Sequence, residues 1–128
     1  MRVYAIGDIH GQLGMLRNAH QRIAEDKARV KDPDAPVVHV GDLVDRGPDS
    51  RGVIQELIDG IAGSAPWIVL KGNHDRLFEM FVRDGKDTDG VLRSDLSWHS
   101  DTMGGRETLL SYGMERSALE RVARFHKR

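Results

Sequence analysis

The sequence contains no cysteine among its 128 residues. Disulfide bonds and thiolate ligands are therefore excluded, so any metal ion must be held by His, Asp, Glu or Asn side chains. No apolar run approaches the roughly 20 residues that cross a bilayer. The N-terminus also lacks the basic and apolar stretches of a secretory signal. These absences predict a cytoplasmic protein with no membrane segment.

The chain also has almost no net charge, because 19 Lys and Arg residues oppose 20 Asp and Glu residues. No chain-wide basic field exists to attract nucleic acid or an anionic membrane, so neither is an expected partner. The length fits a single domain over residues 1–128, and a composition of 39% hydrophobic and 30% charged residues is typical of a globular one.

Short apolar runs alternate with helical patterns through the first two thirds of the chain. Strands are predicted at residues 2–6, 36–40 and 67–70. Helices are predicted over 12–27, after a cap at Asp49 or Ser50, and over 74–82. Their expected buried faces are Leu13, Leu16, Ala19 and Ile23; Val53, Ile54, Leu57, Ile58 and Ile61; and Leu77, Phe78 and Phe81. This β-α-β-α-β-α order predicts an α/β fold with a largely parallel sheet.

The remainder of the chain has a different character. Residues 84–100 are rich in Asp, Gly and Ser and are predicted to form a long connection or lid. A short helix is expected over 104–110, and a final helix over 115–128.

Each predicted strand ends in a glycine followed by a polar cluster. The three clusters are GDIHG at residues 7–11, GDLVDRG at 41–47 and GNHD at 72–75. Because the carboxyl ends of parallel strands lie along one edge of a sheet, the clusters are expected to converge there. The glycines allow the backbone to turn sharply beside the site.

The first ligand candidates suit divalent cations. Asp8 and His10 alternate along an extended segment, so both can bind the same ion. Asp42 can bridge two ions through its two oxygens, and Asn73 offers an amide oxygen to the second ion. Two ions about 3.5–4 Å apart can hold a bridging hydroxide and clamp an in-line displacement at phosphorus. The predicted cofactor is therefore a pair of divalent metal ions.

The neighbouring polar residues are candidates for catalysis and substrate binding. Arg46 has the donor fork that suits two phosphoryl oxygens. His74 is placed to protonate the departing alkoxide, and Asp45 is its natural orienting partner. Taken singly, each motif could be a turn or a surface salt bridge, but three such motifs at successive strand ends point together to catalysis.

Three further histidines carry weaker signals. His39 lies inside a predicted strand and is expected to be a packed or edge residue. His20 is expected to be structural. His99 could face the site from the long connection.

The three clusters resemble the calcineurin-like metallophosphoesterase superfamily, and residues 41–47 resemble in particular its serine/threonine protein phosphatase branch and the bacterial relatives of that branch. The resemblance implies that Asp8, His10 and Asp42 bind the first metal, while Asp42 and Asn73 bind the second. It implies manganese, with iron or zinc as alternatives. It also implies a β-sandwich flanked by helices.

The same resemblance implies that Arg46 grips phosphate and that His74 with Asp45 forms the general-acid pair. The expected function is hydrolysis of phosphomonoesters, on phosphorylated proteins or small phosphoesters. Symmetrical dinucleoside tetraphosphate hydrolases share most of the pattern and are the alternative. In that class a small residue often takes the place of Asp45, which favours the phosphatase.

The chain departs from the family pattern at its end. Family members take further metal-binding histidines from later strands, and Arg128 precedes any such strand, so the chain is expected to be the N-terminal half of the sandwich. Three alternatives follow. The chain is part of a longer protein, it completes its site through another chain or through His99 and His126, or it is a non-catalytic module that binds metal or phosphate. Weak or absent turnover is expected of the chain alone, and an uncovered sheet face is expected to promote self-association.

Overall fold

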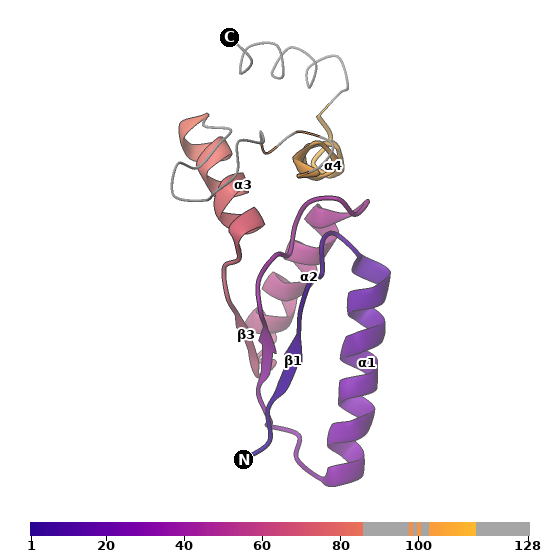
Figure 1. The fold of residues 1–128 in the computed structure, drawn as a ribbon. Helices are drawn as coiled ribbons and strands as arrows, with labels where there is room; N and C mark the ends of the chain where they lie inside the picture. The colour runs from indigo at the N-terminus through magenta and orange to yellow at the C-terminus, as the bar shows by residue number, and fades with distance from the viewer. Residues whose placement is uncertain (86–97, 99, 101–102, 115–128) are drawn as a thin grey trace.

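The computed structural model describes residues 1–85, 98, 100 and 103–114 (Figure 1). These residues form three strands and four helices. The strands are β1 (Tyr4–Ile6), β2 (Val37–His39) and β3 (Trp67–Val69), and the helices are α1 (Leu13–Val30), α2 (Ser50–Ala62), α3 (Asn73–Asp84) and α4 (Gly105–Ser111). The predicted β-α-β-α-β-α order and the short helix after residue 104 are confirmed. The predicted final helix, most of the 84–100 connection, His99 and His126 lie outside the described residues.

The sheet is parallel throughout, with the strand order β1-β2-β3. Tyr4 pairs with Val37, which pairs with Trp67 on the next strand. Each strand has three residues and is shorter than predicted. The carboxyl ends of all three strands therefore lie at one edge of the sheet, as the sequence predicted.

Helices α1 and α2 pack on one face of this sheet. The core contains Leu16 from α1 and Val53 and Leu57 from α2, and the partly buried Trp67 and Val69 of β3 pack against it. Ile9, Leu43 and Val44 join the core from the segments after β1 and β2. Because these three apolar residues are buried, the loops that carry the polar clusters are fixed to the core.

One part of the predicted α2 face is wrong. Ile58 and Ile61 are about half exposed, at 54% and 48%. The ring of Trp67 packs directly against the Cα of Gly60, leaving no room there for a side chain. The buried side of α2 is therefore centred on Val53, Leu57 and Gly60, which places Ile58 and Ile61 at its margin.

The other face of the sheet has no helix or strand packed on it within the described ranges. Ala5, Val38 and Ile68 form one row across this face. Val3, Val40 and Leu70 flank that row, and about half of the surface of each is exposed.

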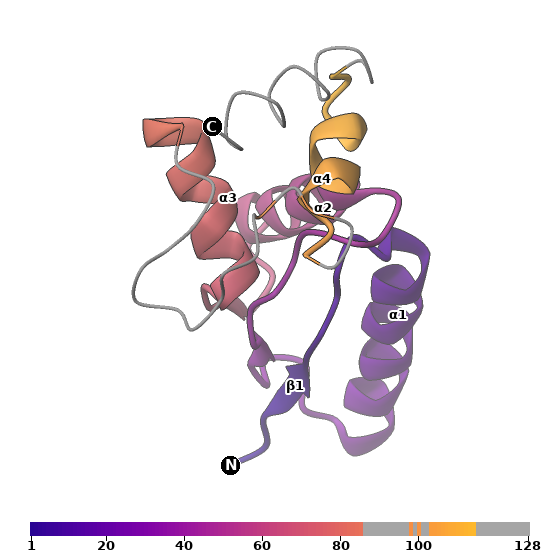
Figure 2. The same cartoon turned by 45° about the horizontal axis from the view of Figure 1, so that its top comes forward.

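A second apolar cluster lies beyond the carboxyl edge of the sheet. It contains Leu77 of α3, Trp98, and Leu109 of α4. The rings of Phe78 and Phe81 pack on Trp98 with centroid distances of 5.5 and 5.0 Å. Helix α4 contacts α2 and lies above the sheet edge in both views (Figures 1 and 2). Among the described residues, no helix is both long and apolar enough to cross a membrane.

Two histidines pair beneath helix α1. His39 of β2 is fully buried, and its Nε2 lies 2.9 Å from Nε2 of His20. The His20 ring stacks on Trp67 with a centroid distance of 4.1 Å. His39 Nδ1 lies 3.1 Å from the carbonyl oxygen of Ile68, an acceptor only, so Nδ1–H donates there and His39 Nε2 accepts from His20. Both residues pack as the sequence predicted.

Candidate functional site

The three polar clusters meet at the carboxyl edge of the sheet. The backbone N–H groups of His10 and Gly11 donate to the carbonyls of Asp42 and Leu43, each at 2.9 Å. The backbone N–H of His74 donates to Asp42 Oδ1 at 3.1 Å. Residues more than 30 positions apart in the chain are therefore fixed beside one another by direct hydrogen bonds.

The backbone of these loops is unusual for non-glycine residues. Asp8, His10 and Asp42 all have positive φ angles, of 51°, 41° and 51°, so the extended segment predicted for Asp8 and His10 is wrong and a turn brings them together. Such conformations are costly and persist where surrounding contacts impose them, which is common at functional sites. Gly41 has a φ of 91°, and a Cβ there would collide with the backbone of Gly72. The second and third clusters approach this closely only because both positions are glycine.

Three predicted ligands form a compact group that fits a divalent cation. Asp8, His10 and Asp42 each offer one ligand atom, and these atoms lie within 4.8 Å of one another. His10 Nδ1 lies 2.9 Å from the carbonyl oxygen of Val44, which can only accept, so Nδ1–H is the donor. The Nε2 lone pair of the neutral ring is then left for a metal, and its orientation is fixed by the backbone. Two carboxylates and an imidazole suit manganese, iron or zinc.

Asn73 lies at the same edge. It is the first residue of α3 and is exposed. Its neighbour Gly72 packs against the Asp42 carboxylate, and its other neighbour His74 donates its N–H to that carboxylate. This places Asn73 next to the Asp8–His10–Asp42 group, while its amide as a ligand for a second ion stays a prediction.

The predicted acid pair is in direct contact. His74 Nδ1 lies 2.7 Å from Asp45 Oδ2, and both side chains are buried. Since the carboxylate accepts, Nδ1–H donates to it, which orients Nε2 to the opposite side of the ring. The His74 ring meets the His10 ring edge-on with a centroid distance of 4.8 Å. The pair therefore lies beside the metal-ligand group.

Asp45 has two further partners that the sequence interpretation missed. Trp98 Nε1–H donates to Asp45 Oδ2 and Thr108 Oγ1–H donates to Asp45 Oδ1, each at 2.7 Å. In this segment the sequence points only to His99, the residue beside Trp98, as a site candidate. The indole N–H of Trp98 was a signal for such a contact, because a buried tryptophan usually needs a hydrogen-bond acceptor.

Asp75, the last residue of the third cluster, also has an unpredicted role. Its carboxylate accepts from the backbone N–H groups of Gly72 at 2.9 Å, Leu43 at 2.8 Å and Val44 at 3.3 Å. Burial raises the pKa of the Asp75 carboxyl above its ordinary value, and the three N–H donors oppose that rise. Asp75 thus joins the start of α3 to the loop after β2. An acidic residue in the first turn of a helix was the available signal.

Arg46 is exposed at the rim of the site. Its backbone has a φ of 70°, and its N–H donates to the carbonyl of Gly104 at 2.9 Å. Gly104 itself packs against Arg46, so the residues just before α4 support the arginine backbone. The phosphate contact of Arg46 stays a prediction.

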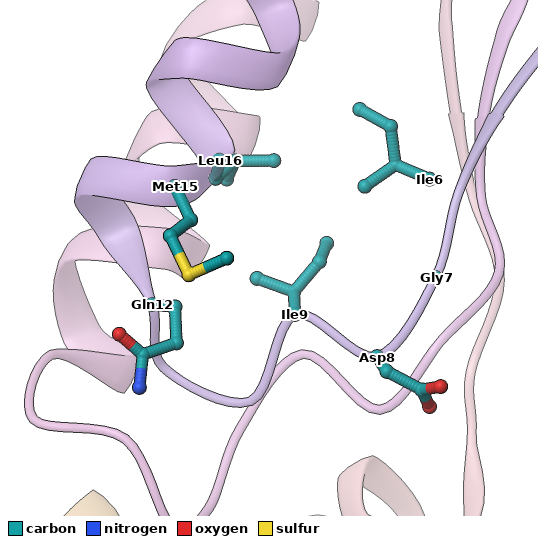
Figure 3. Close-up of a pocket in the computed structure, with 7 residues that line it drawn as sticks. All are labelled: Ile6, Gly7, Asp8, Ile9, Gln12, Met15 and Leu16. Carbon is teal, nitrogen blue, oxygen red and sulfur yellow. The ribbon is translucent and has the colours of Figure 1, made fainter.

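A small apolar cavity of about 150 Å³ adjoins the site (Figure 3). Ile6, Ile9 and Leu16 turn toward one another around it, whereas the Asp8 carboxylate points away from them. The cavity and the Asp8 carboxylate therefore lie on opposite sides of the loop after β1. The cavity belongs to the packing between β1 and α1.

The chain is similar to several bacterial phosphohydrolases. It is 37% identical over 76 residues to serine/threonine-protein phosphatase 1 of Salmonella typhimurium, a match that covers 59% of this chain and 30% of the relative. It is 28% identical over 126 residues to serine/threonine-protein phosphatase 2 of Escherichia coli, covering 97% of this chain and 48% of the relative. It is 38% identical over 85 residues to the symmetrical bis(5'-nucleosyl)-tetraphosphatase of Dechloromonas aromatica, covering 66% of this chain and 28% of the relative.

The chain spans less than half the length of each of these relatives. No solved structure matches it significantly. The family model described as calcineurin-like phosphoesterase matches residues 1–124, nearly the whole chain. With its α/β fold and the polar clusters gathered at one sheet edge, the chain belongs to the calcineurin-like phosphoesterase family.

Proposed function

We propose that the protein carrying this chain hydrolyses phosphomonoesters at the carboxyl edge of its sheet, on phosphorylated serine and threonine or on small phosphoesters. The observation that carries the proposal is the contact between a metal-ligand group and an acid pair. The Asp8–His10–Asp42 group fits a divalent cation, and the Asp45–His74 pair lies directly beside it. Together they suit an ester whose leaving group needs a proton.

The metal is proposed to be manganese, with iron or zinc as alternatives. Asp8, His10 and Asp42 would hold one ion, and Asp42 with Asn73 would contribute to a second. When bound, such ions activate water for attack and neutralise charge on the phosphoryl group.

The chain's own side chains handle the substrate and its leaving group. Arg46, at the rim, offers a planar fork of donors to the phosphoryl oxygens. Asp45 accepts Nδ1–H of the His74 imidazolium, which leaves Nε2–H on the opposite side of the ring as the proton donor. As the bond between phosphorus and the ester oxygen breaks, that oxygen takes the Nε2 proton and leaves as a neutral alcohol.

Leaving-group chemistry favours a phosphomonoester over the alternative substrate. A serine or threonine alkoxide is a poor leaving group and gains most from a proton donor. A nucleotide phosphate leaves readily without one. Symmetrical dinucleoside tetraphosphate hydrolysis stays the second candidate, supported by the 38% identity to one such enzyme. A non-catalytic module that binds metal or phosphate is the third, because the Asp8–His10–Asp42 group can hold an ion without turnover.

The test uses the intact protein with Mn²⁺, a phosphoserine peptide and diadenosine tetraphosphate. We expect faster turnover of the peptide. Asp42→Ala should abolish turnover of both substrates, and His74→Ala should lower kcat on the peptide by about 10²–10⁴-fold, the usual contribution of a general acid. Asp59→Ala, at an exposed position of α2, is the matched control and should keep full activity.

Other outcomes would select the alternatives. A strong preference for the tetraphosphate, with little effect of His74→Ala, would replace the phosphatase proposal with the second candidate. Tight Mn²⁺ binding without turnover of either substrate in the intact protein would favour the binding module. The 128-residue chain by itself is expected to show weak or absent turnover.

A further inference from the structure

We propose that Trp98 and Thr108 are positioning residues that hold Asp45, and through it His74, in the geometry needed for proton donation. This inference rests on the proposed function, because it assigns a role within the same site. It adds residues from the segment 98–114, which the three polar clusters do not include.

The hydrogen bonds of Asp45 carry the argument. Its carboxylate is completely buried and receives three donors, each at 2.7 Å. Oδ2 accepts from His74 Nδ1 and Trp98 Nε1, and Oδ1 accepts from Thr108 Oγ1. Both oxygens are therefore fixed, so the carboxylate cannot rotate without breaking a buried hydrogen bond. Without Trp98 and Thr108, only the hydrogen bond from His74 to Oδ2 would remain, and Oδ1 would lose its side-chain donor.

Thr108 also controls the backbone of Asp45. Its Oγ1 accepts from the Asp45 N–H at 2.8 Å while its own hydroxyl proton goes to Oδ1. Ser50 Oγ lies 3.1 Å from both the Asp45 nitrogen and Thr108 Oγ1. Asp45 has a φ of 77°, an unfavourable conformation for aspartate that these hydrogen bonds offset.

Trp98 connects the acid pair to the helix that carries His74. Its ring is completely buried and packs on Phe78 and Phe81, both of α3. Its carbonyl accepts from Gly105 N–H at 2.9 Å, which joins it to the start of α4. The indole N–H is thus held in one direction, toward Asp45.

These donors are aimed at the acid pair and not at the metal ligands. Trp98 Nε1–H and Thr108 Oγ1–H both donate to Asp45, and Thr108 Oγ1 also lies 3.1 Å from Ser50 Oγ. Removing either donor should therefore weaken protonation of the leaving group while metal binding persists. This separation distinguishes a positioning role from general support of the fold.

The experiment compares two leaving groups in the intact protein with Mn²⁺. Phenyl phosphate needs protonation of its leaving oxygen far more than p-nitrophenyl phosphate does. We expect Thr108→Val and Trp98→Phe to lower kcat on phenyl phosphate by about tenfold or more, with p-nitrophenyl phosphate changing less than about threefold and KM unchanged. Thr108→Ser keeps the hydroxyl and should restore both rates to near the unmodified values.

A second readout does not depend on turnover. In the metal-free intact protein, long-range proton–nitrogen NMR should show His74 as the Nδ1–H tautomer, and both substitutions should mix the two tautomers. Equal losses on the two phosphates, or an unchanged tautomer in both variants, would overturn the positioning role. If the unmodified protein hydrolyses neither phosphate, the proposed function fails, and the tautomer measurement alone then decides the positioning role.

Discussion

At the scale of single residues, the metal-ligand group depends on one backbone carbonyl. The carbonyl of Val44 engages Nδ1 of His10, so Nε2 is the nitrogen left to bind an ion together with Asp8 and Asp42. A ring held in this way loses little freedom on binding an ion. The three side chains should therefore bind a divalent cation in this chain, even without ligands from elsewhere.

We expect Mn²⁺ to bind the 128-residue chain, and His10→Ala or Asp42→Asn to weaken that binding by at least about 10–100-fold. The reason is the loss of one of three converging ligands. Isothermal titration calorimetry with Mn²⁺ measures the affinity. Asp59→Asn removes a carboxylate at an exposed position of α2 and serves as the control. Equal affinity in all four proteins would show that the ion binds elsewhere.

At the scale of secondary-structure elements, α1 is joined to the sheet by the His20–His39 pair. Burial, helped by the neighbouring His39, lowers the pKa of His20 from 6.5 to about 4. Burial also lowers the pKa of His39. Both rings are therefore neutral in the fold at neutral pH, and the hydrogen bond requires this of His39, whose Nε2 is the acceptor. Among the described residues, the buried Nδ1 of His20 has no partner, so its lone pair would be the site of protonation.

This arrangement predicts a loss of stability in acid. The unfolded chain takes up a proton on His20 near pH 6.5, whereas the folded chain does so only near pH 4. The unfolded state thus binds more protons between these values, so the free energy of unfolding rises with pH across this window and falls on acidification. We expect a loss of about 1–2 kcal/mol from pH 6.5 to pH 4, a value reduced because water reaches the half-buried ring.

Urea unfolding at several pH values measures this effect. His20→Phe keeps a ring stacked on Trp67 and removes the titrating group. The variant should show a shallower dependence of unfolding free energy on pH between 6.5 and 4. Parallel curves for the variant and the unmodified chain would mean that other groups cause the acid loss.

At the scale of the whole molecule, the sheet is covered on one face only within the described residues. Val3, Val40, Ile68 and Leu70 expose about half of their surface there, and none carries a charge. Such an apolar face favours contact with another surface. This exposed apolar face is the physical reason to expect the self-association that the sequence predicts for the 128-residue chain.

We expect the sedimentation coefficient of the chain to rise with concentration. Ile68→Lys places a charge on the exposed face, on the edge strand β3, and should shift the chain toward monomer. Val82→Lys makes the same change on α3, away from that face, and should behave as the unmodified chain. A chain that stays monomeric over a wide concentration range would contradict the prediction.

Much of the fold and of the site's composition could be predicted from the sequence. The alternation of short apolar runs with helical patterns predicted the parallel sheet, and the glycine and polar residues after each run predicted one shared edge. The exposure of Ile58 and Ile61 could not be predicted in this way. It depends on how closely α2 approaches Trp67 at Gly60, a distance set by packing between elements and not by helical periodicity.

The sequence by itself determined which chemical groups meet, because local strand and turn patterns fix the edge at which Asp8, His10, Asp42, Asp45 and His74 emerge. Only the tertiary structure decided how those groups are held. The carbonyl that orients His10 is 34 residues away in the chain, and the donors on Asp45 from Trp98 and Thr108 are 53 and 63 residues away. Hydrogen bonds across such separations follow from the packing of whole elements, which no local pattern in the sequence records.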